Sequence, residues 1–302
     1  MPTYVDDNLP EQRILEQAVR LPDGGAVTGW AAARLHGAAF FDGLDRDGTT
    51  HFPVPLALGR RGRIRPDEHV VLVYHALPPG EVVVRHGIRV VTPERAVVDH
   101  QRLIGDPREV VVALDMLAAA AVVSPEQVAL HGRALAAGER VALELAVSRA
   151  SEHSRSPNET RLRLIAEVDA GLPRLLVNCP VHCLSGRLLG IADLLDVEAG
   201  LAIEYDGAEH RTATRHTRDV AKDEAFRRAG LELTRITGYD LRDVSLVVDR
   251  LTQARSRAAF TAAEQRRWVA SPPANTLHER LVEQRLALHR HEELVADTTW
   301  PL

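Results

Sequence analysis

Residues 188 to 219 read LLGIADLLDVEAGLAIEYDGAEHRTATRHTRD, and this stretch decides how the second half of the chain folds. Two apolar runs flank a short segment, VEAG at 197 to 200, which is the pattern of a β-hairpin. Acids interrupt both runs: Asp193 lies in the first, and Glu204 and Asp206 lie in the second. These carboxylates need a physical reason, because a charge is costly to bury unless it is paired.

The alternation of side chains along a strand predicts where these acids point. If residues 197 to 200 form the loop, Asp196 faces Leu201 and Asp193 faces Glu204 across the hairpin. Because successive side chains point to opposite faces, Asp193, Glu204 and Asp206 share one face. The other face is expected to be apolar and to carry Ala192, Leu194, Ile203 and Tyr205.

Directly opposed carboxylates repel one another, and a divalent cation relieves that repulsion. Mg²⁺ is typically held by one or two protein carboxylates together with waters and substrate phosphates. It polarises phosphorus and lowers the pKa of an attacking water. The pattern therefore favours an Mg²⁺ (or Mn²⁺) site at Asp193 and Glu204. The alternative is a solvated sheet face with ordinary surface acids.

The segments around the hairpin predict the order helix, three strands, helix, strand, helix. Turn residues and periodicity separate the predicted elements. These are a helix at 156–171, strands at 174–183, 188–196 and 201–207, a helix at 212–230, a strand at 231–237 and a helix at 240–256.

This order, with Glu159 on the first helix, IEYDGAEH at 203–210 and RDVAKDEAFRRAGLELTRIT at 218–237, resembles the PD-(D/E)xK nuclease superfamily. Within it, the chain is most similar to a bacterial family related to very-short-patch-repair endonucleases, over roughly 154–255. The resemblance implies a restriction-endonuclease-like αβββαβ core and an Mg²⁺-dependent nuclease. It also implies that Asp193 and Glu204 ligate the metal and that Glu159 is an auxiliary acid.

The chain departs from the superfamily pattern at one position. A lysine is expected two residues after the glutamate, where this chain has Asp206. Lys222, on the following helix, is the only lysine among the 37 basic residues. An ammonium group can lose its proton when its pKa is lowered, whereas a guanidinium stays charged. Lys222 is therefore the candidate to activate water or stabilise charge, with an ordinary Asp219–Lys222 helix pair as the alternative.

Further basic residues follow the hairpin. His210 comes three residues after Gly207 and is a candidate for contacting phosphate or orienting water. Arg211, Arg215 and Arg218 form a basic strip suited to phosphate contact, or else a solvated helix face.

The first half of the chain predicts short helices and several short strands. AVTGWAAARLHGAAFFDG at 26–43, GIRVVTPERAVVDHQRL at 87–103 and EVVVALDMLAAA at 109–120 resemble an AbiEi-like antitoxin-type domain over roughly 10–145. The resemblance implies a winged-helix-like unit that binds DNA or a protein partner. The expected protein partner is a toxin or a repair protein. Thr28 is expected to cap the helix that follows it.

The composition excludes some classes of protein. The formal net charge of -5 excludes a globally basic nucleic-acid binder, so contacts with DNA or RNA must use local patches. The start of the chain is polar and the longest apolar run is too short to span a bilayer, so a cytoplasmic protein without membrane contact is expected. Cys179, His182 and Cys183 are spaced too far apart along a strand for one zinc site.

The sequence thus predicts an α/β protein with an α+β N-terminal module. The expected domains are an antitoxin-like module at 1–147, a restriction-endonuclease-like domain at 151–257 and a helical extension at 258–302. The expected function is Mg²⁺-dependent hydrolysis of nucleic-acid phosphodiesters, with DNA favoured over RNA. The alternative is a catalytically inactive DNA- or partner-binding regulator, which the missing Glu-x-Lys lysine favours.

Overall fold

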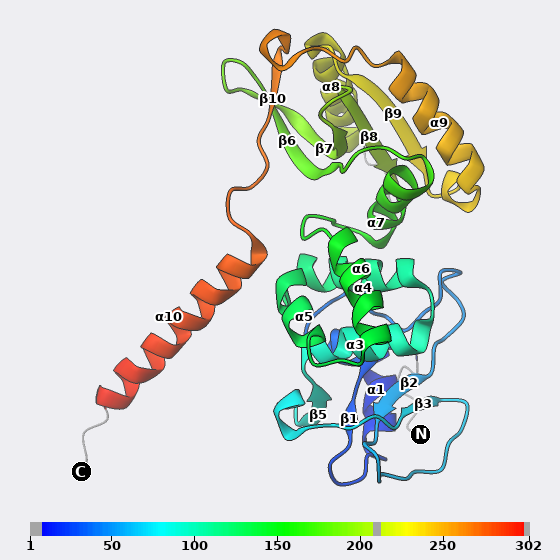
Figure 1. The fold of residues 1–302 in the computed structure, drawn as a ribbon, viewed down its shortest axis with the longest axis vertical. Helices are drawn as coiled ribbons and strands as arrows, with labels where there is room; N and C mark the ends of the chain where they lie inside the picture. The colour runs from blue at the N-terminus through cyan, green and yellow to red at the C-terminus, as the bar shows by residue number, and fades with distance from the viewer. Residues whose placement is uncertain (1–7, 208–212, 299–302) are drawn as a thin grey trace. The chain divides into compact units, whose positions relative to one another are not determined.

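The computed structural model describes residues 8–207 and 213–298, and the chain divides into two compact units (Figure 1). Unit 1 comprises Met1–Glu152 and Leu277–Leu302, and unit 2 comprises His153–Thr276. The expected extension at 258–302 is therefore divided: its first part belongs to unit 2 and its final helix to unit 1. Across the described residues, no helix is both long and apolar enough to cross a membrane.

Unit 1 is a five-stranded mixed sheet packed with helices. The strand order is β3-β2-β1-β5-β4, in which β1–β5 and β2–β3 are parallel and the other neighbours are antiparallel. Its elements are α1 (Pro10–Ala18), β1 (Ala26–Val27), α2 (Gly29–Leu35), β2 (Val54–Ala57), β3 (Val70–Val73), η1 (Pro79–Glu81), β4 (Val82–Arg85), β5 (Ile88–Val91), α3 (Pro93–Ile104), α4 (Pro107–Ala119), α5 (Pro125–Gly132), α6 (Ala137–Arg149) and α10 (Leu277–Thr298).

Helix ends in unit 1 follow local sequence signals. Ser124 and Gln127 form a reciprocal capping box at the start of α5, and the Asp106 side chain accepts a hydrogen bond from the backbone of Arg108 in α4. Helix α10 begins on the other helices of the unit, where Leu277 and Leu281 pack against Ala118 of α4.

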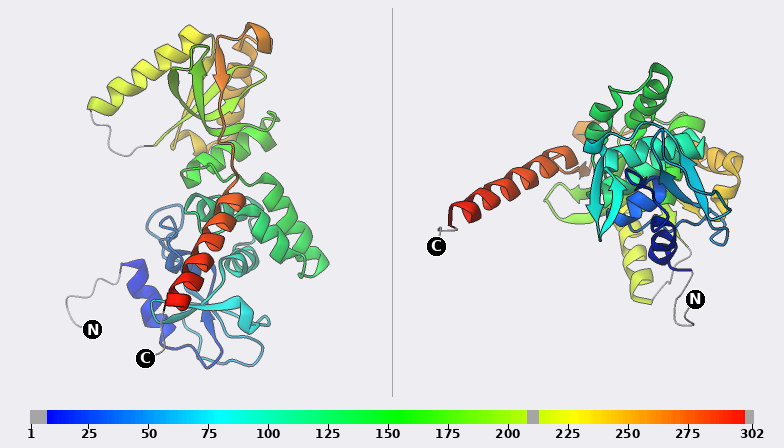
Figure 2. Two further views of the ribbon diagram at one scale, coloured as in Figure 1. Left: turned by 90° about the vertical axis from the view of Figure 1, so that its left-hand side faces the viewer. Right: turned by 90° about the horizontal axis from the view of Figure 1, so that it is seen from below.

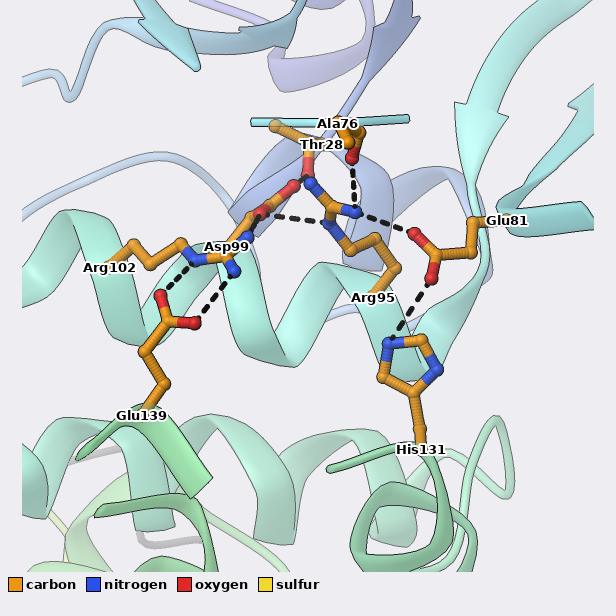
Figure 3. A network of polar contacts seen from close by, with 8 residues as sticks. All are labelled: Thr28, Ala76, Glu81, Arg95, Asp99, Arg102, His131 and Glu139. Carbon is orange, nitrogen blue, oxygen red and sulfur yellow. Dashed lines mark hydrogen bonds and ion pairs between the residues drawn. The ribbon is translucent and has the colours of Figure 1, made fainter. Parts of the chain in front are cut away.

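A buried polar network joins the strands of unit 1 to its helices (Figure 3). Asp99 of α3 is fully buried and accepts hydrogen bonds from Arg95 at 2.9 Å and from Arg102 at 2.7 Å. Thr28 does not cap α2 as expected: its hydroxyl donates to the other Asp99 oxygen at 2.7 Å. Arg95 also reaches Glu81, and Arg102 reaches Glu139 of α6. Asp99 therefore ties the segment between β1 and α2 to α3 through Thr28, and its two guanidinium partners extend the network to η1 and α6.

From α7 to α9, unit 2 has the element order that the sequence predicts. It also has a strand, β10, in the part that was expected to be a helical extension. Its sheet has the order β10-β6-β7-β8-β9; β8 and β9 are parallel, and the other neighbours are antiparallel. Its elements are α7 (Pro157–Leu164), η2 (Ile165–Asp169), β6 (Leu176–Cys183), β7 (Leu188–Asp196), β8 (Leu201–Asp206), α8 (Ala213–Ala229), β9 (Glu232–Thr237), η3 (Asp240–Arg242), α9 (Val244–Arg257), η4 (Ala263–Gln265) and β10 (Trp268–Ala270). The architecture of the whole chain is mixed α/β.

Helices cover both faces of the unit 2 sheet (Figures 1 and 2). On one face, Leu194 and Ile203 pack with Leu162 of α7 and with Val247 of α9. On the other face, Ala202 packs with Phe226 of α8. Because both faces are covered, a polar side chain on the central strands is buried by a helix rather than exposed to water. Glu204 thus lies beneath α8, where Lys222 reaches it, in an environment that penalises its charge.

The network around Asp99 generates a prediction about stability. Asp99→Asn removes the charge that two buried guanidinium groups share, so it should reduce the stability of unit 1 by about 3 to 5 kcal/mol. Hydrogen exchange of the α3 amides would measure this loss within unit 1 alone. Glu68→Gln, at a side chain that is 88% exposed, is the control and should change protection little. Unchanged α3 protection in Asp99→Asn would show that the network does not stabilise the unit.

Candidate metal centre beneath helix α8

The observed pairing of β7 with β8 has the predicted register. Asp196 pairs with Leu201 and Leu194 with Ile203, so Asp193 and Glu204 follow one step beyond the last pair. At that step, the Asp193 side chain continues the ladder: its Oδ2 accepts a hydrogen bond of 2.8 Å from the backbone N–H of Tyr205. The carboxylate of Asp193 is therefore fixed between the two strands by the main chain of β8.

The alternation of side chains along β7 is interrupted at Asp193, so residues on either side of it that should share a face lie on opposite faces. The sequence did not predict this change of face. Ala192 packs in the cluster beneath α8, whereas Leu194 packs in the cluster beneath α9, although residues two apart in a regular strand share a face. The neighbouring strand makes the same change between Val177 and Cys179. Asn178 lies between them with a positive φ of 46°. Three residues therefore share the expected apolar face: Leu194, Ile203 and Tyr205. Ala192 was also expected there and lies on the other face, because the left-handed residue of β6 interrupts the side-chain alternation.

Glu204 is the most buried acid of the hairpin pair, with 5% of its surface exposed. Its Oε2 accepts a hydrogen bond from the Lys222 ammonium group of α8, and Lys222 Nζ also lies 3.4 Å from the carbonyl oxygen of Ile191. Its Oε1 is buried and has no hydrogen-bond partner in the described part of the chain. One oxygen of a buried carboxylate is therefore left to accept a ligand.

Burial and mutual repulsion shift the titration of both acids. Burial raises the pKa of Glu204 to about 7, and the neighbouring Asp193 carboxylate also raises it, while Lys222 acts in the opposite direction. Burial raises the pKa of Asp193 as well; the hydrogen bond from Tyr205 opposes this shift, and the charge of Glu159 adds to it. Two carboxylates whose charged forms are both disfavoured form a site that a cation would stabilise.

Glu159 lies within electrostatic range of Asp193 but is engaged in local hydrogen bonds. Its Oε1 accepts from the Ser156 hydroxyl at 3.1 Å, and its Oε2 accepts from the Arg155 backbone at 3.0 Å. The Asn178 amide donates to Oε2 at 2.8 Å and also to the carbonyl of His153. Glu159 therefore holds Asn178 to the start of α7. Asn178 is the residue of β6 at which the side chains change from one face of the sheet to the other.

The remaining predicted residues are placed as follows. Asp206 is the last residue of β8 and pairs with Thr237 of β9. His210 and Arg211 lie outside the described residues. Arg215 and Arg218 lie in α8, but their side chains are outside the described part of the structure. The structure thus brings together Glu159, Asp193, Glu204 and Lys222.

The structure adds a residue that sequence reasoning did not select. Gly190 of β7 lies directly under Lys222: a Cβ at this position would be 2.5 Å from Lys222 Cγ and 3.2 Å from Phe226 Cε1. The lysine side chain crosses β7 at this glycine on its way to Glu204. A glycine inside a strand signals close approach by another group, so the signal was present in the sequence.

The donor set of this pair fits a hard divalent cation. Among the described residues, no group of three or more His, Cys, Asp and Glu side chains is arranged to hold a metal ion. Mg²⁺ does not require such a group, because one or two carboxylates and its own waters suffice. The unpartnered Glu204 Oε1 beside Asp193 provides this kind of site.

One comparison with known proteins covers this hairpin, and it assigns no function. A family model described as "Protein of unknown function (DUF2726)" matches residues 191–254, from the middle of β7 to the end of α9. No curated protein and no solved structure matches the chain. The matched segment contains Asp193, Glu204 and Lys222.

The raised pKa of Glu204 generates a prediction about stability and pH. A carboxyl with a raised folded-state pKa favours folding below its ordinary pKa of 4.5, and this contribution is lost as the pH rises through about 7. In EDTA, Glu204→Gln should therefore be more stable than the wild type at pH 8, by up to roughly 3 kcal/mol, and not at pH 4. Urea unfolding at both pH values checks this. Glu224→Gln, at an exposed site of α8, should show no such pH dependence; a Glu204→Gln protein destabilised at pH 8 would contradict the prediction.

Gly190 generates a second prediction. Gly190→Ala places a methyl group where Lys222 Cγ lies, so Lys222 must leave Glu204 or the strand must move, at a loss of about 1 to 3 kcal/mol. Urea unfolding would measure the loss, and a crystal structure would show where Lys222 goes. The matched control is Gly80→Ala, because a Cβ there meets no atom within 4 Å. Equal stability of the two variants, with Lys222 still on Glu204, would contradict the close approach.

Proposed function

We propose that unit 2 is a metal-dependent nuclease that hydrolyses nucleic-acid phosphodiesters, with DNA favoured over RNA. The observation that carries the proposal is Glu204, a buried carboxylate beside a second carboxylate. One of its oxygens accepts from the only lysine of the chain, and the other has no hydrogen-bond partner among the described residues. The order α7-β6-β7-β8-α8-β9 supports the proposal, because it is the order of the restriction-endonuclease-like core that the sequence resembles.

The residues of the site have separable roles in this proposal. Asp193 and Glu204 would hold Mg²⁺ or Mn²⁺, which would supply Lewis-acid stabilisation of the phosphate and an activated water. Asp193 is pre-positioned by the Tyr205 N–H, so it would lose less side-chain freedom on binding a cation. Glu159 would act on the metal site indirectly: it holds Asn178, the residue at which the side chains of β6 change from one face of the sheet to the other.

Lys222 has two states that the geometry allows. In the structure its ammonium group donates to Glu204 and neutralises part of the buried charge. A cation held by Asp193 and Glu204 would take over that neutralisation and would leave the ammonium group to face a phosphate oxygen or to exchange a proton with water. His210, Arg211, Arg215 and Arg218 remain the proposed contacts to phosphate, and Asp206 remains a proposed auxiliary acid at the end of β8.

The second candidate function is a regulator that binds nucleic acid or a toxin-type partner without cleaving. Asp206 at the position of the expected lysine favours it, as does the resemblance of unit 1 to an antitoxin-type domain. In this case the Glu204–Lys222 pair would be a permanent ion pair that replaces the metal. The two candidates therefore differ in whether a divalent ion displaces Lys222 from Glu204.

Cleavage assays separate the candidates. Plasmid DNA, single-stranded DNA and RNA are incubated with the full chain and Mg²⁺ or Mn²⁺. Cleavage should fall at least about a hundredfold in Asp193→Asn and in Glu204→Gln, because each removes a charged group from the reacting centre. Activity that survives Asp193→Asn would refute the metal assignment. No cleavage of any substrate, together with no divalent-ion binding in calorimetry, would favour the regulator.

Lys222 offers a sharper test because its two roles have different chemical requirements. Lys222→Arg keeps the positive charge and loses the ability to exchange a proton near neutral pH. If the lysine exchanges a proton, Lys222→Arg should be as inactive as Lys222→Ala, with at least about a hundredfold loss. If it only neutralises charge, Lys222→Arg should retain most of the rate. Full activity in Lys222→Ala would exclude both roles; Arg228→Ala, at an exposed site of α8, is the control for the helix.

A further inference from the structure

The loop between β2 and β3 of unit 1 concentrates positive charge in a chain of net charge -5. It contains the sequence GRRGRIR at 59–65, in which Arg60, Arg61, Arg63 and Arg65 are all exposed. Across the described residues, none of these four arginines forms a salt bridge with a carboxylate. The nearby acid Asp67 is already paired with Arg20 at 2.8 Å. The loop therefore presents guanidinium groups whose charge is left to an outside partner.

The loop has a fixed conformation, although it contains neither helix nor strand. Gly62 lies against the end of β2: a Cβ there would be 2.3 Å from the Leu58 carbonyl oxygen, so only glycine fits. Ile64 is partly buried and packs against the hydrophobic core of unit 1. The Arg20 guanidinium of the segment after α1 donates to the carbonyl of Arg65. These anchors hold the backbone in place while the arginine side chains point to solvent.

Arg63 is itself oriented by three contacts. Its guanidinium lies 5.6 Å from the centroid of the Tyr74 ring, a cation–π distance, and Tyr74 is 45% exposed. Its Nη1 donates to the carbonyls of Gly62 at 2.8 Å and of Arg60 at 3.4 Å. A guanidinium held in this way loses less conformational entropy when it binds, and its remaining N–H groups suit the two oxygens of a phosphate.

We propose that this arginine loop, residues 59–65 with Tyr74, binds the phosphate backbone of nucleic acid without reading the base sequence. The inference rests on the proposed function, because it gives unit 1 the task of holding the polymer that unit 2 cleaves. A membrane surface is a poorer partner, since Ile64 faces the core and leaves no apolar side chain of the loop to insert. Exposed arginines on an ordered loop provide the contacts that position a backbone.

The test is a binding measurement that does not depend on cleavage. Fluorescence anisotropy of a labelled 30-base-pair DNA duplex is followed in EDTA with the full chain at several salt concentrations. The triple variant Arg60→Gln, Arg61→Gln, Arg63→Gln should bind at least about tenfold more weakly at 50 mM salt. Its slope of log K against log salt should be shallower by about 2 to 3, because each lost duplex phosphate contact removes about 0.9 from the slope.

A matched control removes the same charge elsewhere in unit 1. Arg133, Arg280 and Arg285 are also exposed, and replacing all three by Gln should leave the affinity within about twofold of the wild type and the slope unchanged if charge position matters. The triple Lys variant of residues 60, 61 and 63 keeps the charge and should retain most of the slope. Equal losses in the Lys and Gln triples would show a folding effect and would overturn the proposal.

The remaining outcomes separate this proposal from the proposed function. If the triple Gln variant of the loop loses duplex binding and the control triple does not, the proposed binding role of the loop is supported even when no cleavage is found. If the triple Gln variant of the loop binds the duplex as tightly as the wild type and still cleaves, the binding role of the loop is overturned. The proposal that unit 2 is a nuclease is then unaffected. Binding of the loop to phosphatidylserine vesicles but not to duplex or single-stranded DNA or RNA would assign it to a membrane and overturn the proposal as well.

Discussion

The carboxylate of Glu204 is the constraint on which the second unit depends. It lies on a central strand between two layers of helix, where its charge is opposed by burial and by Asp193 and is balanced by the single lysine of the chain. The surroundings accommodate this one group in several ways. Gly190 clears a path for Lys222, the Tyr205 N–H holds Asp193, and Asn178 reverses the face of the neighbouring strand. An apolar residue in place of Glu204 would carry no charge to balance, so the fold would not need Lys222 and the path that Gly190 leaves for it.

The two units use buried charge differently. In unit 1, Asp99 is fully buried and both of its oxygens have donors; among the described residues, the atom of that network that is buried without a hydrogen-bond partner is a donor, Arg95 Nη2. In unit 2, one oxygen of Glu204 has no hydrogen-bond partner within the described part of the chain, and the pKa of Glu204 is raised to about 7. A buried carboxylate with donors on both oxygens stabilises a fold, whereas a buried carboxylate oxygen without a donor is a candidate ligand for a cation. The contrast within one chain is the main reason for placing chemistry at Glu204 and not at Asp99.

Much of this was readable in the sequence. The period of two and the VEAG turn predicted the register of the hairpin, and the observed pair Asp196–Leu201 confirms it. Lys222 was selected because no other lysine exists, and it does reach Glu204. The face change could not be predicted, because it depends on the left-handed backbone of Asn178, which is set by tertiary hydrogen bonds to Glu159 and His153. Gly190 was missed for a related reason: its role appears only when α8 is laid across β7.

The central claim is that a divalent ion takes the free oxygen of Glu204 and joins it to Asp193. Crystals soaked in Mn²⁺ and measured at the manganese absorption edge test this directly. The account predicts an anomalous peak bonded to one oxygen of each carboxylate, with the Lys222 ammonium moved away from Glu204, and no peak in Glu204→Gln crystals treated in the same way. A wild-type map without a peak at this pair, in which Lys222 still donates to Glu204, would contradict it.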